Sequence, residues 1–318
     1  MSGTKIGEEL GASRSEVWRL IQQLRGLGVD VAGHPATGYQ LRAVPDLLLP
    51  EFLQPLVRST MFGSHLNHFY RIGSTNTVAM EAAAAGAPEG SVFLAEEQLT
   101  GRGRGANAWQ SPRSTGIYCS IVLRPAVPPS DVLILSLAAA LAVRAAVLAV
   151  YPGLAVDLKW PNDLLIGDKK FCGILTEMNA EVTRVRHAVV GVGINVNQSV
   201  FPAELAEQAT SLRIATGTDG SRVELAAALL KSLDREVRNL FGDSAGRQGV
   251  LARFSEGSSW VRGRRVRITE NGATDGASLE GTTEGLDDRG FLLVRTGRGV
   301  ETVLSGTVRK VDHHASGS

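Results

Sequence analysis

The sequence of 318 residues has only two cysteines, Cys119 and Cys172, and their spacing does not match a metal site. No segment at the N-terminus has the features of a secretory signal. These absences favour a reducing compartment, and we expect a cytoplasmic protein.

The chain also lacks an excess of charge of either sign, since 33 Lys and Arg residues face 32 Asp and Glu residues and the net charge is +1. The whole surface is therefore not a nonspecific binder of nucleic acid, and any contact with DNA requires a local basic patch. Six histidines are scattered without the spacing of a metal site or a catalytic triad. No G-x-x-x-x-G-K-[ST] sequence occurs, which excludes a P-loop.

Long hydrophobic runs are rare, and the main one covers residues 132–150. Arg144 interrupts it, and Ser130 and Asp131 before it are typical of a helix N-cap. We predict a core helix rather than a membrane span, and no membrane partner.

What the sequence does contain is a glycine-rich, basic loop at residues 98–112, QLTGRGRGANAWQSP. Its backbone can turn tightly at Gly101, Gly103 and Gly105. Arg102 and Arg104 supply planar, permanently charged groups suited to phosphate and carboxylate, and Trp109 offers a flat face for a purine or another ring. The loop is therefore a candidate site for an anion.

The same loop satisfies the G-x-G-x-x-A pattern of dinucleotide-binding proteins through Gly101, Gly103 and Ala106. That pattern requires a helix to follow directly, whereas here Trp109 and Pro112 precede a strand-like run at residues 117–123. The context disfavours a nicotinamide site.

Three further segments follow in order: KWPND at residues 159–163, KKFCGILTE at 169–177 and GVGINVN at 191–197. Together with GRGR and the upstream triplet Ser74-Thr75-Asn76, they resemble the biotin protein ligase family. The resemblance covers roughly residues 3–311 and points to the bifunctional type, which carries an N-terminal winged helix-turn-helix and acts as biotin operon repressor.

The resemblance implies two substrates, biotin and ATP, with Mg²⁺ accompanying the ATP. The expected biotin-binding residues are Ser74, Thr75, Asn76, Gln98, Gly101, Arg102, Gly103, Arg104, Lys170 and Gly173. The expected ATP and adenylate contacts are Arg102, Trp109, Lys159, Asn162, Gly191 and Asn195. The glycine pair at 191 and 193 is expected to leave room for ligand beside its strand. No dedicated carboxylate cage for a metal is visible.

The chemistry suggests roles for three residues. A carboxylate must be activated before an amine can attack it, most simply as a mixed anhydride with AMP, and two anions must then meet. Arg104 and Lys170 are the expected sources of positive charge at the transition state, while Arg102 neutralises phosphate or orders the loop. In the second step Asp163 is expected to orient or deprotonate the acceptor amine.

The expected acceptor is the biotin carboxyl carrier protein of acetyl-CoA carboxylase. One departure concerns the loop, because the commoner family pattern continues GRGR with R-G-R/K, whereas this chain has GANA at residues 105–108. Fewer charges there can alter loop ordering or retention of the adenylate. Homodimer formation is consistent with the resemblance.

The N-terminal residues 1–44 read as a partial winged helix-turn-helix. Apolar residues follow helical spacing on either side of Gly11, at Ile6, Leu10, Val17, Leu20, Ile21 and Leu24. Ser13 is expected to cap the second helix, and residues 29–41, bent around Thr37-Gly38, suit a wing. The expected DNA contacts are Ser13, Arg14, Ser15 and Arg19.

The winged helix of the family begins with one further helix, which we expect to be missing here. Ile6, Leu10 and Ile21 would then lack a cover, so either the start codon lies upstream or the domain is degraded. Glu16 offsets the basic residues of the second helix, so a small packing appendage remains an alternative to DNA binding.

We predict an α+β fold. Residues 50–259 should form the catalytic domain, a mixed, mainly antiparallel sheet with helices on one face. Strands are expected at residues 68–72, 91–95, 117–123, 155–159, 170–178 and 186–194, and helices at 76–85, 131–150 and 222–241. A turn at Gly167-Asp168 should place Lys169 and Lys170 at the start of a returning strand.

Residues 262–312 should form an SH3-like barrel, with strands at 264–269, 279–286, 291–295 and 301–305, followed by a disordered tail at 313–318. Two alternatives to the ligase stay open. One is a lipoate or octanoate ligase of the same wider fold, and the other is a ligand-responsive DNA-binding protein without ligase activity.

Overall fold

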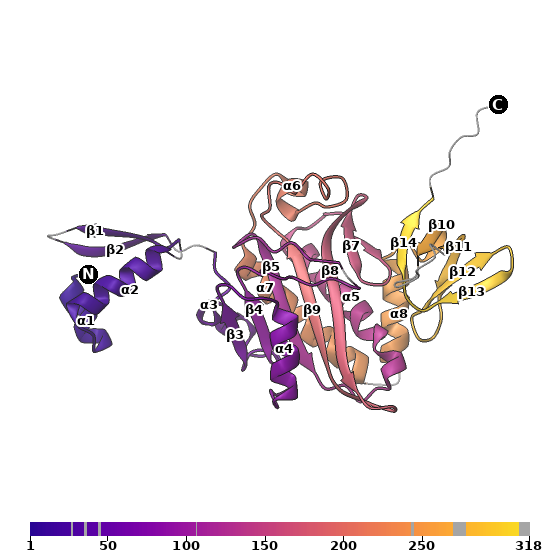
Figure 1. The fold of residues 1–318 in the computed structure, drawn as a ribbon, viewed down its shortest axis with the longest axis horizontal. Coiled ribbons are helices and arrows are strands. Elements are labelled where there is room, and N and C mark those ends of the chain that lie inside the picture. Colours follow the sequence, from indigo (N-terminus) through magenta and orange to yellow (C-terminus); the bar gives the residue numbers. More distant parts are fainter. Residues whose placement is uncertain are drawn as a thin grey trace. The chain divides into compact units, whose positions relative to one another are not determined.

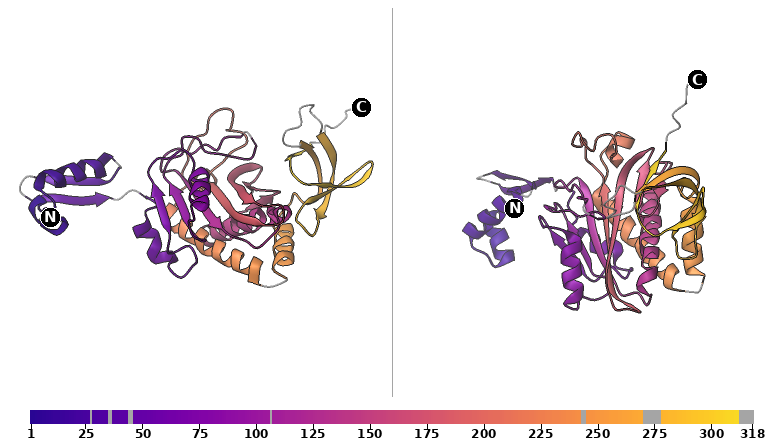
Figure 2. Two further views of the ribbon diagram at one scale, coloured as in Figure 1. Left: turned by 60° about the horizontal axis from the view of Figure 1, so that its bottom comes forward. Right: turned by 45° about the vertical axis from the view of Figure 1, so that its right-hand side comes forward.

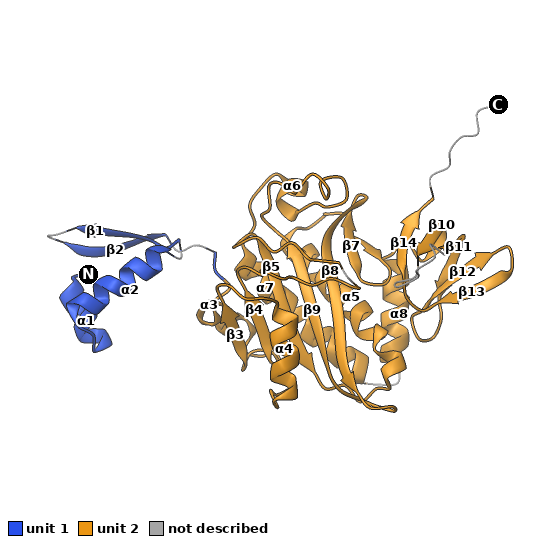
Figure 3. Cartoon of the chain, viewed as in Figure 1, with its two compact units in different colours: residues 1–47 blue, residues 48–318 orange. Residues whose placement is uncertain are grey.

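A computed structural model describes residues 1–26, 28–34, 37–43, 46–105, 107–242, 245–269 and 278–311. The chain divides into two compact units, Met1–Leu47 and Leu48–Ser318 (Figure 3). The tail predicted at 313–318 lies outside the described residues.

The first unit is a helix-turn-helix followed by a hairpin. Helix α1 (Gly3–Leu10) ends at Gly11, whose φ of 63° is the left-handed conformation that glycine adopts without strain. Helix α2 (Arg14–Gly26) follows, and strands β1 (Asp30–His34) and β2 (Gly38–Ala43) pair antiparallel as the wing. The predicted helix-turn-helix with a wing is confirmed.

A capping box begins α2. The hydroxyl of Ser13 accepts a hydrogen bond from the Glu16 amide at 3.3 Å, and the Ser13 amide donates to Glu16 Oε2 at 2.8 Å. Hydrogen bonds from the hydroxyl and amide of Ser13 also lower the pKa of the Glu16 carboxyl. The predicted cap is confirmed.

The apolar face of the two helices, at Ile6, Leu10 and Ile21, was predicted to lack a cover, and the structure agrees for only one of these positions. Ile21 is buried among Val17, Val29 and Val31, and Ile6 is half-buried against that cluster, so the prediction was wrong for these two positions. Leu10 is 61% exposed, as predicted. The wing supplies the valines that cover Ile21.

The second unit is built on a seven-stranded sheet with the order β3-β4-β5-β9-β8-β7-β6 (Figure 1). Only β3 and β4 pair in parallel, and the other neighbours are antiparallel. The strands are β3 (Leu66–Phe69), β4 (Val92–Ala95), β5 (Gly116–Leu123), β6 (Asp157–Lys159), β7 (Asp163–Ile166), β8 (Lys169–Ala180) and β9 (Val185–Asn195). The mixed, mainly antiparallel sheet is confirmed.

Helices cover both faces of this sheet rather than one, so that detail of the prediction was wrong. Alternate residues of a strand point to opposite faces. Phe93, Val122 and Val189 accordingly pack against α4 (Thr75–Ala84), while their neighbours in the strands belong to the main core with α5 (Leu133–Val150) and α7 (Arg222–Gly242). Figure 1 shows α4 on the near side of the sheet and α5 behind it.

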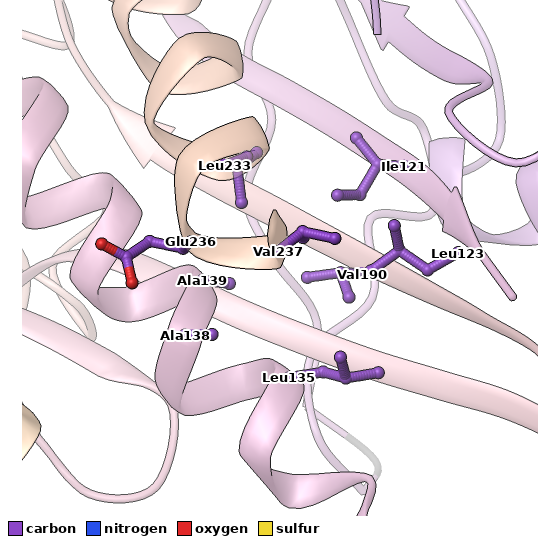
Figure 4. Close-up of a pocket in the computed structure, with 9 residues that line it drawn as sticks. All are labelled: Ile121, Leu123, Leu135, Ala138, Ala139, Val190, Leu233, Glu236 and Val237. Carbon is purple, nitrogen blue, oxygen red and sulfur yellow. The ribbon is translucent and has the colours of Figure 1, made fainter. Parts of the chain in front are cut away.

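Helix α5 is the predicted core helix. It is long and apolar enough to cross a membrane by composition, yet most of its residues are buried between the sheet and its neighbouring helices. A cavity of about 10 Å³ remains between α5, α7 and strands β5 and β9, lined by Leu135, Val190 and Glu236 among others (Figure 4). That volume is close to the minimum for one water molecule, so the core is tightly packed at this place.

Several elements were not predicted as such. Helices α3 (Pro50–Val57), α6 (Leu212–Thr216) and α8 (Gly246–Glu256) belong to the second unit, and strand β14 (Thr307–Lys310) joins the C-terminal sheet. The predicted hairpin is present, because Gly167 and Asp168 connect β7 to β8, with Gly167 at a φ of 60°.

The C-terminal residues form a five-stranded antiparallel sheet with the order β13-β12-β11-β10-β14 (Figure 2). Its strands are β10 (Arg262–Thr269), β11 (Ser278–Leu286), β12 (Leu292–Thr296), β13 (Gly299–Val303) and β14. This small curled sheet agrees with the predicted SH3-like barrel.

Trp160 joins this barrel to the larger sheet. Its side chain is wholly buried, and Nε1 donates a hydrogen bond to the backbone oxygen of Gly290 at 2.9 Å, in the turn between β11 and β12. The residue therefore has a structural role.

We expect Trp160→Phe to lower the free energy of unfolding of the second unit by about 1–3 kcal/mol, because the Gly290 carbonyl loses its buried donor. Urea unfolding measures this. Trp18→Phe, at a position 58% exposed on α2, is the control and should change stability by less than about 0.5 kcal/mol. Equal stabilities for Trp160→Phe and the wild type would contradict the role assigned to this bond.

Candidate active site

A cavity of about 820 Å³ opens where the loops of the large sheet meet strand β14 of the barrel. This volume lies within the range of sites for small molecules and cofactors. Of the predicted site residues, the following line it: Ser74, Thr75, Asn76, Gln98, Arg102, Gly103, Arg104, Trp109, Lys159, Asn162, Asp163, Lys170, Gly173, Gly191 and Asn195. Segments far apart in the sequence thus form one site.

Gly101 is the predicted residue that does not line the cavity. It is buried, and a Cβ atom there would lie 2.3 Å from the backbone oxygen of Trp109 and 2.8 Å from Ser111 Oγ. Its role is to let the two arms of the loop approach each other, since Trp109 N donates to Gly101 O at 2.9 Å.

The basic loop forms a small hairpin of its own. Arg102 and Ala108 pair as an antiparallel bridge, and Gly103 N donates to Asn107 O at 2.8 Å. Asn107 closes the turn by donating from its backbone and its side chain to Arg104 O, at 3.3 and 3.0 Å. The departure at residues 105–108 therefore still allows an ordered loop, although Ala106 itself lies outside the described residues.

The indole of Trp109 rests on the backbone of two neighbouring strands at Gly173 in β8 and Gly193 in β9. A Cβ atom at Gly193 would lie 2.5 Å from Trp109 Nε1, and one at Gly173 would lie 3.0 Å from Trp109 Cζ3. Trp109 Nε1 is buried without a hydrogen-bond partner among the described residues. A donor held in this way inside a cavity can serve a ligand.

The glycines at 191 and 193, which were expected to leave room for ligand, both line the cavity. The space at Gly193 holds the indole of Trp109, and the space at Gly191 holds the amide of Asn76, whose Oδ1 would lie 2.0 Å from a Cβ atom. Protein side chains occupy the room that these glycines leave.

The predicted biotin-binding side chains at the start of α4 form a buried hydrogen-bond network. Gln98 Oε1 accepts from the backbone amide of Thr75 at 2.8 Å and from its hydroxyl at 3.1 Å. Ser120 Oγ donates to Asn76 Oδ1 at 2.6 Å and lies 2.8 Å from Thr75 Oγ1, and Gln98 Nε2 donates to Ser111 Oγ at 2.8 Å. Ser111 and Ser120 are members of this site that sequence reasoning missed.

Arg102 is held by a carboxylate rather than left free for phosphate. Its guanidinium makes a two-pronged pair with Glu177 of β8, at 3.1 and 2.6 Å, and Glu177 also accepts from Asn76 Nδ2 at 3.0 Å. Of the two roles considered for Arg102, ordering of the loop is the one that this geometry supports. Glu177 was missed because 75 residues separate it from Arg102.

The three predicted catalytic residues lie together. Lys170 Nζ is 2.6 Å from Asp163 Oδ1 and 5.3 Å from the centre of the Trp109 ring. Arg104 Nη1 donates to Asn162 Oδ1 at 3.2 Å, next to Asp163 in the KWPND segment. Burial lowers the pKa of Arg104, and the negative charge of Asp163 opposes that effect. Arg104 and Lys170 thus both interact with the carboxylate of Asp163.

More positive charge surrounds that carboxylate. Lys159 Nζ lies 4.5 Å from the centre of the Trp260 ring, and the guanidinium carbon of Arg264 lies 4.3 Å from it. Burial lowers the pKa of Lys159, Asp163 raises it, and the charges of Lys170, Arg309 and Arg264 lower it further. Trp260, which lines the cavity, and Arg264 were missed because the first directly precedes the barrel and the second belongs to it, where no site was expected.

Asn162 and Asn195 already have protein partners. Asn162 Nδ2 donates to Ile174 O at 2.8 Å, and Asn195 Nδ2 donates to Thr210 O at 3.0 Å while its Oδ1 accepts from Gln198 at 3.2 Å. Their amides thus hold the walls of the cavity in place.

No group of three His, Cys, Asp or Glu side chains that could hold a metal occurs in the part of the chain that the structure describes. Both cysteines are buried. Burial raises the pKa of the Cys119 thiol to about 12, and it also raises the pKa of the Cys172 thiol above its ordinary value. Their thiols are therefore packing groups.

The predicted DNA-contacting residues lie in the first unit. Ser13, Arg14, Ser15 and Arg19 are exposed, and the hydroxyl of Ser13 is engaged in the capping box. Arg14, Ser15 and Arg19 lie on the first turns of α2.

We expect Gly193→Ala to weaken binding of ATP on the order of tenfold, because the added methyl group displaces the Trp109 indole from the strands. Calorimetric titration measures the affinity. Gly249→Ala in α8, where a Cβ atom meets nothing within 4 Å, is the matched control and should bind as the wild type does. Unchanged affinity in Gly193→Ala would show that Trp109 does not shape the ligand site.

Comparison with known sequences identifies three regions. Residues 68–195 match the Biotin/lipoate A/B protein ligase family, residues 262–311 match the Biotin protein ligase C terminal domain, and residues 1–40 match an HTH domain. Each of these matches falls within one of the three regions described above.

Several characterised relatives align over most of the chain. The Bifunctional ligase/repressor BirA of Bacillus spizizenii is 36% identical over 97% of this chain and 93% of its own length. The Biotin--[acetyl-CoA-carboxylase] ligase of Mycobacterium tuberculosis is 34% identical over 83% of this chain and 97% of its own. The biotin protein ligase of Aquifex aeolicus, solved with biotin and ATP, superposes with a TM-score of 0.67 at 27% identity, over 78% of this chain and all of its own. On these grounds the chain belongs to the biotin protein ligase family.

Proposed function

We propose that this protein activates biotin with ATP to biotinyl-5′-AMP and transfers biotin to one lysine of the biotin carboxyl carrier protein of acetyl-CoA carboxylase. The observation that carries the proposal is the meeting of Arg104, Lys170 and Lys159 around Asp163, beside a pocket of neutral polar groups at the start of α4. An anion and an uncharged ureido ring require these two environments side by side.

In the first step a carboxylate oxygen of biotin attacks the α-phosphorus of ATP, and the bond from that phosphorus to the pyrophosphate oxygen breaks. Negative charge concentrates on the phosphoryl oxygens. Arg104 and Lys170 would face that charge. Two observations support this role: both residues line the cavity, and both contact the KWPND segment. Trp109 would pack beside the adenine.

Biotin would lie towards α4. Ser74, Thr75 and Gln98 present hydroxyl and amide groups there. Two hydrogen bonds between Thr75 and Gln98 fix the orientation of their side chains before the ligand arrives. Mg²⁺ would come with the phosphates of ATP, since the described residues offer no cage of their own for it.

In the second step the amine of the carrier lysine attacks the carbonyl carbon of the anhydride, and AMP leaves with the electron pair of the broken C–O bond. The amine must lose a proton, for which Asp163 is the carboxylate at hand. Lys170 holds Asp163 at 2.6 Å in this structure. If the phosphate of the adenylate draws Lys170 away from Asp163, the Asp163 carboxylate becomes free to accept a proton from the amine of the carrier lysine.

The same chain would act as a biotin-dependent repressor through the winged helix-turn-helix at residues 1–44, which lies in the first unit. Support comes from the exposed basic residues of α2, from the HTH match, and from relatives that are named bifunctional ligase/repressor. We assign ligation to residues 50–259 and the barrel to residues 262–312, place the protein in the cytoplasm, and expect repression to involve a homodimer.

Lys170→Ala should lower the rate of adenylate formation about a hundredfold or more, as loss of one transition-state donor typically does, while biotin affinity falls less. Pyrophosphate release with biotin and ATP measures the rate. Lys169→Ala is the matched control, since Lys169 lies next to it in β8 and its Nζ donates to Ala206 O at an exposed position. Wild-type rates in Lys170→Ala would overturn the assignment of this lysine.

The variant Arg14→Ala with Arg19→Ala should weaken operator binding and reduce the slope of log affinity against log salt concentration by about 2, the contribution of two phosphate contacts. A fluorescence anisotropy titration at several salt concentrations measures both. Arg235→Ala, an exposed change on α7 in the other unit, controls for net charge. An unaltered slope would remove α2 from the DNA interface.

A further inference from the structure

One carboxylate in the second unit is completely buried and uses both oxygens for hydrogen bonds. Glu96 Oε1 accepts from the backbone amide of Leu48 at 2.8 Å and pairs with His68 Nε2 at 3.0 Å. Glu96 Oε2 accepts from Arg222 Nη2 at 2.8 Å and from Ser114 Oγ at 3.1 Å. The Arg222 side chain is as fully buried as the carboxylate.

Such a cluster is not explained by stability alone. Removal of two charges from water offsets much of their mutual attraction, so an apolar core of the same volume is often as stable. What a buried ion pair does supply is a fixed geometry, because each donor has one place to bind. The position of this cluster in the chain therefore matters more than its energy.

Glu96 lies where the basic loop begins and Ser114 lies where it ends. Strand β4 ends at Ala95, Gln98 of the polar pocket follows two residues after Glu96, and β5 begins at Gly116. Beyond the side-chain bond, Ser114 N donates to Glu96 O at 2.9 Å, and Arg222 Nη1 donates to Gly116 O at 3.1 Å. Both roots of the loop are thus tied to one carboxylate.

Ser114 adopts a backbone conformation that this position requires. Its φ is 54°, and no other non-glycine residue has a positive φ in the part of the chain that the structure describes. A non-glycine residue is held in this left-handed region only where its surroundings impose it. Here the two bonds to Glu96 impose it.

The other oxygen of the carboxylate, Glu96 Oε1, binds a residue that lies earlier in the chain. Leu48 is the first residue of the second unit, directly after the helix-turn-helix unit ends at Leu47. Its side chain is wholly buried, and its amide is bound to Glu96 Oε1. The two oxygens of a carboxylate move together. Ser114 at the end of the basic loop and Leu48 at the start of the second unit are therefore held by the same side chain.

We propose that Glu96 is a positioning residue, which fixes the roots of the loop at residues 101–109 and links their order to the backbone at Leu48, where the chain continues from the DNA-binding unit. The inference rests on the proposed function, in which Arg104 and Trp109 of this loop contact the adenylate.

Glu96→Gln would leave the buried Arg222 without its charge partner and can fail to fold. Ser114→Ala is the sharper variant, because it removes one bond to the carboxylate and keeps the ion pair. Thr115→Ala is the matched control, since Thr115 Oγ1 donates to Pro112 O at 3.1 Å in the same segment and does not touch Glu96.

The first readout is the rate at which biotinyl-5′-AMP, formed from biotin and ATP by the full chain, is released in rapid gel filtration. Ser114→Ala should release it about tenfold faster, as expected for a loop that has lost one hydrogen bond to a charged group. Thr115→Ala should match the wild type. Equal release from Ser114→Ala and Thr115→Ala would overturn the positioning role.

The second readout is hydrogen exchange at the amide of Leu48. Biotin and ATP should slow this exchange in the wild type, and Ser114→Ala should abolish the slowing. A Leu48 amide that does not respond to ligand in the wild type would overturn the link. A wild type that forms no adenylate would instead contradict the proposed function, so the two failures are distinguishable.

Discussion

The packing of one indole ring against the backbone of two strands determines the candidate active site. Trp109 can lie on β8 and β9 only because Gly173 and Gly193 carry no side chains. This contact folds the basic loop back over the sheet, sets Arg104 beside the KWPND segment and leaves Lys170 near the ring. Neutral contacts therefore bring together charges that would otherwise repel.

Electrostatics gives the site its sign. Asp163 interacts with three cations, Lys159, Lys170 and Arg104. Positive charge therefore exceeds negative charge in this cluster. A low-dielectric wall such as Trp260 strengthens the field of these cations. The cluster is therefore suited to a polyphosphate and to the charge that develops when biotin attacks it. Strand β14 closes the same cavity, so the barrel belongs to the site as much as the sheet does.

Much of this site could be predicted because its residues occur in short ordered motifs, and the fold brings those motifs to one cavity. Partners far apart in the sequence could not be found in that way. Nothing in the sequence near Arg102 indicates Glu177, and nothing near Glu96 indicates Arg222, 126 residues later. These pairs depend on strand order and helix packing, which periodicity does not specify.

The fold shows the same division. Strong apolar periodicity located the strands of the large sheet and helix α5. Helices α3 and α8 escaped prediction because Pro55 lies inside the first, and Gly246 and Gly249 weaken the helical propensity of the second. Strand β14 is too short and too polar to be recognised from its sequence. The sequence also did not indicate that α4 covers the other face of the sheet, because a short alanine-rich helix has no clear apolar side.

The central claim is that this site joins biotin to a protein lysine. The direct measurement is the intact mass of an apo carboxyl carrier domain after incubation with the full chain, Mg-ATP and equal amounts of biotin and lipoate. A mass increase equal to one biotin amide is the predicted result. An increase equal to one lipoyl group, or no increase, would contradict the claim.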